Sequence, residues 1–133
     1  MYLLNNKSAP LLELTAATLA AQMATARGET QKALDEWRRA APLEAQLLYD
    51  EPPAWLYPVN QSLGAALLRS GDAVGAEKIF RETLATRPRD GRLLFGLWQS
   101  LVAQKRDSEA MLVRQQHEEA WKNATVKLAV TDL

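Results

Sequence analysis

The sequence contains no cysteine and only one histidine, His117. The lack of cysteine excludes disulfide bonds, thiol nucleophiles and cysteine-ligated zinc or iron–sulfur sites. With one histidine, a multi-histidine metal site within one chain is excluded as well. We therefore expect no metal and no cofactor. His117 stands in the polar stretch 114–119, and we expect it to be an exposed surface residue.

Charge of one sign is not in excess, because 16 Lys and Arg balance 16 Asp and Glu. A nucleic-acid partner and a polybasic membrane contact both normally require a basic excess, so neither is expected. Long hydrophobic runs are also absent: the most apolar stretch, 11–26, is too short and too polar to span a bilayer. The first residues do not resemble a signal peptide. We expect a cytoplasmic protein.

The residues that are present favour a helical fold. Of the 133 residues, 47% are hydrophobic, and between sparse glycines and prolines they recur every three to four positions. This spacing predicts a helix from Val59 to Ser70-Gly71 and a second from Ala73 to Arg87-Pro88, where the proline disfavours further helix. Further helices are predicted around 93–102 and 110–121. We predict an all-α protein.

An internal repeat of 34 residues relates Leu63 to Leu97 and Ala76 to Ala110. The segment 57–90 resembles a tetratricopeptide repeat. The residues that carry the resemblance are Leu63, Gly64, Gly71, Asp72, Ala76, Phe80 and Pro88. With Tyr-Asp-Glu-Pro-Pro ahead of Ser-Leu-Gly-Ala-Ala-Leu-Leu, the chain is similar to the C-terminal repeats of uncharacterised bacterial tetratricopeptide proteins. That similarity implies no particular activity.

The resemblance implies an α-α superhelix of about three helix–turn–helix repeats in a single domain, residues 1–133. The repeats would cover about 14–47, 57–90 and 91–124, with an insertion at 48–56 and a tail at 125–133. The third repeat departs from the pattern, because Trp98 replaces the glycine and Lys105-Arg106 replaces the Gly-Asp of the turn. We expect its helices to splay or to shift in register.

In this family the first helix of each repeat lines a concave groove that binds a peptide or a partner helix. The resemblance therefore implies that outward positions of these helices bind the partner. The candidates are Gln22, Gln61, Leu68, Arg69, Arg92, Phe95 and Gln99. Each is equally compatible with an ordinary solvated helix position. The set with which chaperone-binding members grip a terminal carboxylate is expected to be absent, since only Arg92 fits it.

The insertion offers a second candidate site. It is rich in proline and aromatic residues, and it contributes Tyr49, Asp50, Glu51, Trp55 and, at its end, Tyr57. These residues form either a structural linker or the rim of a pocket for a peptide or small ligand. The second reading would give a small-ligand-binding or enzyme-accessory module.

Catalysis finds little support in the sequence. The carboxylate pairs Asp35-Glu36 and Glu118-Glu119 point about 100° apart on a helix, so neither forms a dyad that shares a proton. We expect no enzyme but a non-catalytic protein–protein interaction scaffold. We also expect either a homodimer through the solenoid ends or a piece of a longer array. The alternating stretch 126–130 would pack back as an arm or pair with another chain.

Overall fold

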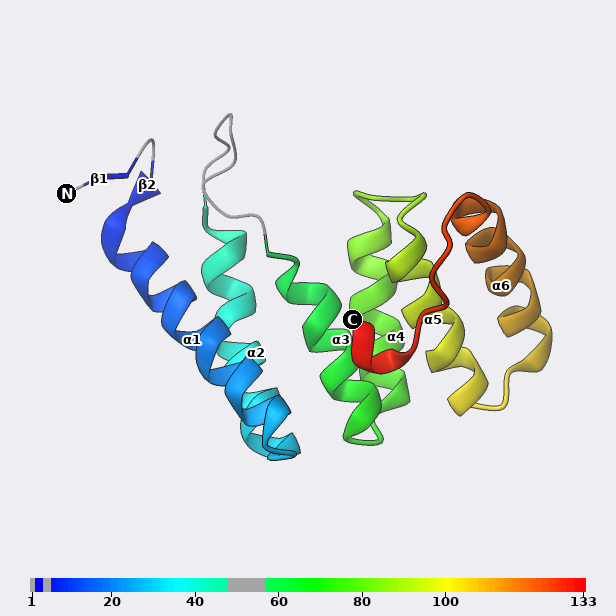
Figure 1. The fold of residues 1–133 in the computed structure, drawn as a ribbon, viewed down its shortest axis with the longest axis horizontal. Helices are drawn as coiled ribbons and strands as arrows, with labels where there is room; N and C mark the ends of the chain where they lie inside the picture. Colours follow the sequence, from blue (N-terminus) through cyan, green and yellow to red (C-terminus); the bar gives the residue numbers. More distant parts are fainter. Residues whose placement is uncertain (1, 4–5, 48–56) are drawn as a thin grey trace. The chain divides into compact units, whose positions relative to one another are not determined.

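The structure, a computed structural model, describes residues 2–3, 6–47 and 57–133. Six α-helices follow one another in these ranges (Figure 1): α1 (Ser8–Ala26), α2 (Thr30–Ala45), α3 (Val59–Arg69), α4 (Ala73–Leu84), α5 (Gly91–Ala103) and α6 (Asp107–Trp121). Two short antiparallel strands, β1 (Tyr2–Leu3) and β2 (Asn6–Lys7), precede them, and a 3-10 helix, Val130–Asp132, follows. The all-α prediction is confirmed, and consecutive helices pair into three hairpins.

The chain divides into two compact units, Met1–Val59 and Asn60–Leu133. The first unit contains the hairpin of α1 and α2. Small side chains of α1, such as Ala17 and Ala21, are buried and let α2 approach closely. Trp37 of α2 is only 2% exposed, and its ring stacks on Tyr57 with centroids 5.6 Å apart. α1 begins at Ser8, six residues before the predicted start of the first repeat at 14.

The turns inside the three hairpins have the same hydrogen bonds. Gly28, Gly71 and Lys105 all have positive φ, at 72°, 89° and 57°. In each turn the next residue donates its N–H to the carbonyl five positions earlier, as Asp72 does to Leu67 at 2.9 Å. This arrangement closes a helix at a left-handed residue. The three turns therefore keep the predicted spacing of 43 and then 34 residues.

The third turn reaches this geometry without a glycine. The expected shift in register at Lys105-Arg106 is therefore wrong at the turn itself: Arg106 donates to Leu101 at 3.0 Å, as Asp72 does to Leu67. Lys105 adopts the left-handed conformation although its Cβ disfavours it. The neighbouring helices are packed well enough to impose that conformation.

Lys105→Gly is expected to stabilise the second unit by about 1 kcal/mol, because glycine adopts a positive φ without steric cost. Urea unfolding followed by circular dichroism measures the change. Lys105→Ala is the matched control: it removes the same side chain but keeps the Cβ, so little gain is expected. An equal gain from both variants would locate the effect in the lysine side chain rather than in the backbone.

The end of α4 differs from the prediction. The helix ends at Leu84, although Pro88 alone would allow it to continue to about Thr86. The last turn tightens before the proline, because the amide of Thr86 donates to the carbonyl of Thr83 at 3.1 Å. Such bonds to the third preceding residue commonly close a helix end.

Phe80 of α4 is the centre of the second unit and has no exposed surface. Its ring lies against two glycines, Gly64 of α3 and Gly96 of α5, where a Cβ atom would come within 3.0 Å of the ring atoms. Both neighbouring helices thus approach the same ring at a position without a side chain. The sequence predicts Gly64 as a close-contact position but not Gly96.

Candidate binding face

A non-helical segment of the chain lies on the face formed by α3 and α5. This C-terminal segment, residues 125–133, runs back from the end of α6 across α5 to α3 (Figure 1). Ser62 of α3 donates through Oγ to the carbonyl of Leu133 at 2.9 Å. Arg92 of α5 donates through Nη1 to the carbonyl of Asp132 at 2.7 Å. Of the two predicted alternatives for 126–130, the structure shows the arm that packs back.

Trp121, the last residue of α6, forms a third contact with the segment. Its indole Nε1–H donates to the carbonyl of Val126 at 2.7 Å. The Arg92 guanidinium lies 5.8 Å from the centre of the Trp121 ring, within reach of a cation–π interaction. We call Ser62, Arg92 and Trp121 the α3–α5 face. All three side chains donate to main-chain carbonyls, so they hold the segment by its backbone.

Aromatic residues support this face from below. His117 of α6 lies 5.5 Å from Phe95, 5.9 Å from Trp98 and 5.9 Å from Trp121, measured between ring centres. This network fixes Trp121 relative to α5. Trp98, which replaces the glycine of the repeat, lies beneath the Arg114 guanidinium at 5.4 Å.

The prediction that His117 is exposed is wrong, because its side chain is only 7% exposed. Its Nδ1 lies 2.9 Å from the carbonyl of Gly91, and since a carbonyl only accepts, Nδ1 carries the hydrogen. The spacing of Ala110, Val113 and His117 places the histidine on the buried stripe of α6. That spacing was the available signal, and the polar neighbours of His117 hid it.

The predicted groove residues fall into different environments. Arg92 reaches the C-terminal segment, and Gln99 and Leu68 are half-buried. Gln22 and Arg69 are exposed. Phe95 is 6% exposed, so its predicted outward position is wrong: the ring packs against Trp98 and His117. Gln61 is buried as well, at 6%. Sequence reasoning missed Trp121 as a contact residue.

The predicted loop site is described only at its edge. Tyr49, Asp50, Glu51 and Trp55 lie outside the described residues. Tyr57 is half-buried, with its ring parallel to Trp37 at an interplanar angle of 4°. This contact anchors the end of the insertion to α2.

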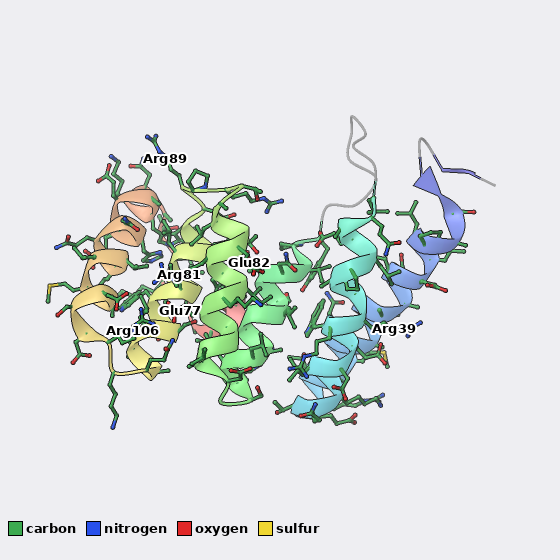
Figure 2. The ribbon with its side chains drawn as sticks, turned by 180° about the vertical axis from the view of Figure 1, so that it is seen from behind. Arg39, Glu77, Arg81, Glu82, Arg89 and Arg106 are labelled. Atoms are coloured by element: carbon green, nitrogen blue, oxygen red, sulfur yellow. The ribbon has the colours of Figure 1, made fainter. Side chains whose placement is uncertain are left out.

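A charged cluster joins α4 to the turn between α5 and α6. Figure 2 shows Glu77, Arg81 and Arg106 close together there. Glu77 accepts from Arg106 at 2.6 Å, from Gln104 at 2.8 Å and from Arg81 at 2.8 Å. Burial raises the pKa of the Glu77 carboxyl, but the hydrogen bonds from Gln104 and Arg81 and the Arg106 charge together lower it below 4.5. The cluster therefore stabilises the ionised carboxylate.

Glu77→Gln is expected to lower the free energy of unfolding at pH 7 by about 1 kcal/mol, because it removes a charge from hydrogen bonds to two arginines. A lowered pKa in the folded state gives stability that is present above the unfolded value of 4.5 and is lost as the pH falls through the folded value. Urea unfolding at several pH values measures this.

The matched control for this experiment is Glu82→Gln. Glu82 lies on the same helix, but its pair with Lys78 is long, at 4.0 Å, and both side chains are exposed. Its loss is expected to change stability by less than about 0.5 kcal/mol. A difference between Glu77→Gln and the wild type that persists at pH 3 would contradict a role for the Glu77 charge.

The outer side of α6 presents a second candidate surface. Met111 and Leu112 are 61% and 62% exposed, and an open depression beside Leu112 is lined by Arg89, Leu94, Gln115 and Glu119. The lining mixes apolar residues with both signs of charge. This surface corresponds to the predicted end face of the last repeat.

Within residues 8–47 and 57–133, no group of three His, Asp or Glu side chains gathers closely enough to hold a metal ion. No helix in the part of the chain that the structure describes is long and apolar enough to cross a membrane. Comparison of the chain with protein-family models, with curated proteins and with solved structures finds no match.

Proposed function

We propose that the chain is a non-catalytic module that binds an extended segment of a partner protein on the α3–α5 face. One observation carries the proposal: side chains of three helices donate hydrogen bonds to main-chain carbonyls of a non-helical segment. Any extended peptide offers such carbonyls, so the face is suited to peptide binding. The resemblance to tetratricopeptide repeats points to the same class of function.

The alternative is a module that binds a ligand through the residues 49–57, or that associates through the outer side of α6. The stacking of Tyr57 on Trp37 favours a structural role for the end of the insertion. The exposed Met111 and Leu112 favour association through α6. The α3–α5 face is preferred because it is the surface on which a bound segment is present.

Arg92→Glu is expected to weaken peptide binding at least tenfold, because it removes the donor to the peptide backbone and the cation beside Trp121. Peptides selected from a random display library against the intact chain serve as probes, and fluorescence anisotropy gives their dissociation constants. Arg89→Glu is the matched control: it makes the same charge change on an exposed residue of the α4–α5 connection, away from the three donors.

The result that would refute the α3–α5 face is equal binding by the wild type and Arg92→Glu. Loss of binding in Trp55→Ala, with Arg92→Glu unaffected, would assign the function to the insertion instead. Circular dichroism of each variant checks that its helices remain folded.

A further inference from the structure

We propose that residues 125–133 are a built-in competitor for the α3–α5 face, so that the chain regulates its own access to an extended partner segment. The inference rests on the proposed function and adds to it a regulatory segment and a description of the ligand. Three features of the segment carry it: how it is held, which of its side chains are covered, and where it is attached.

The segment is held by its backbone at three separate points. Ser62, Arg92 and Trp121 donate to the carbonyls of Leu133, Asp132 and Val126. The Asp132 carboxylate does not pair with Arg92. It accepts instead from the amide of Ala129 at 2.7 Å, within the segment. Recognition of the main chain alone does not depend on sequence, so a partner segment with free carbonyls satisfies the same donors.

Side chains of the segment divide into covered and exposed positions. Leu128, Val130 and Leu133 are half-buried. Val126, by contrast, is 62% exposed, and the polar residues Thr131 and Asp132 are exposed too. The covered positions are apolar and spaced two and three residues apart. The favoured ligand is therefore an extended, uncharged segment with apolar residues in that spacing.

The attachment of the segment makes the competition effective. It follows α6 directly, and the bond from Trp121 to Val126 holds its beginning next to the face. A short tether gives an effective concentration of about 1 mM, so even a segment that binds weakly on its own occupies the site. A partner must overcome this occupancy, whereas a weakened segment lets it bind more tightly.

The test uses the intact chain and a fluorescently labelled synthetic peptide of residues 124–133. A loosened chain carries Leu128→Asp and Val130→Asp, which place charge at two covered positions. We expect it to bind the peptide at least tenfold more tightly than the wild type, which is 1.4 kcal/mol. Val126→Asp is the matched control: it adds a charge to the same segment at an exposed position, and it should bind like the wild type.

Two results would overturn the inference: equal affinity of the wild-type and loosened chains, or no binding by a loosened chain that circular dichroism shows to be folded. If the aspartate variant does not fold, Leu128→Ala with Val130→Ala provides the same comparison. A wild-type chain that light scattering shows to be a dimer, and that becomes a monomer in the loosened variant, would show that the segment pairs with a second copy and would also refute the inference.

The experiment separates this inference from the proposed function. If library-selected peptides bind both chains equally but lose affinity with Arg92→Glu, the α3–α5 face binds peptides and the segment does not compete. If Arg92→Glu has no effect on the selected peptides, the proposed function itself fails.

Discussion

Phe80→Ala is expected to lower the free energy of unfolding of the second unit by about 4 kcal/mol, a large part of the stability of a domain of this size. The Phe80 side chain has no exposed surface and fills the space between α3 and α5. Its removal leaves a cavity that the two flanking glycines cannot fill, because they have no side chains. The cost is therefore the lost burial of the ring together with the cavity.

Urea unfolding measured by hydrogen exchange is the appropriate experiment, because a chain with two compact units need not unfold in one step. Amides of α3 to α5 report the second unit, and those of α1 and α2 report the first. Val74→Ala is the matched control on the same helix: Val74 is 67% exposed, and its loss should cost less than about 0.5 kcal/mol. A loss below about 2 kcal/mol for Phe80→Ala would contradict the central role of the ring.

Gly96→Ala is expected to destabilise the second unit by about 2 kcal/mol, although the same change in an open helix stabilises by about 1 kcal/mol. The sign is reversed because a Cβ at Gly96 would overlap Cζ, Cε1 and Cε2 of Phe80. Leucine lacks those three atoms. In a Phe80→Leu background, Gly96→Ala should therefore cost much less or become stabilising.

A double-mutant cycle measures this coupling from the unfolding free energies of the four proteins. Coupling of about 2 kcal/mol is expected for two groups in direct contact. Additive effects of Gly96→Ala and Phe80→Leu would show that the glycine is required for another reason. Gly64→Ala offers the same test on the α3 side of the ring.

The hairpins could be predicted because their signals are local. Helical spacing, a left-handed residue at each turn and the repeat period all depend on neighbours within a few positions. Even the third turn kept its position, since Lys105 takes the place of glycine at the expected spacing. The cost of a positive φ at a lysine is small compared with the packing of two helices against each other.

The candidate site was harder to predict, because its residues meet only through tertiary packing. His117 has charged and polar neighbours in the sequence, yet packing against Phe95 and Trp98 buries it. Phe95 was expected to point outward and faces α6 instead. A shift of about 100° around a helix axis for each residue decides such placements, and one-residue errors in assigning a face are enough to reverse them.

The sequence by itself determined the fold class, the three hairpin turns and the closing of each hairpin around small residues. These follow from backbone preference and periodicity. Only the tertiary structure decided that Gly96 faces Phe80 and that residues 125–133 lie on α3 and α5. The segment is 71 residues from Ser62 in the chain. Donors that bind main-chain carbonyls leave no mark in the amino-acid sequence of their ligand, so no pattern announces such a contact.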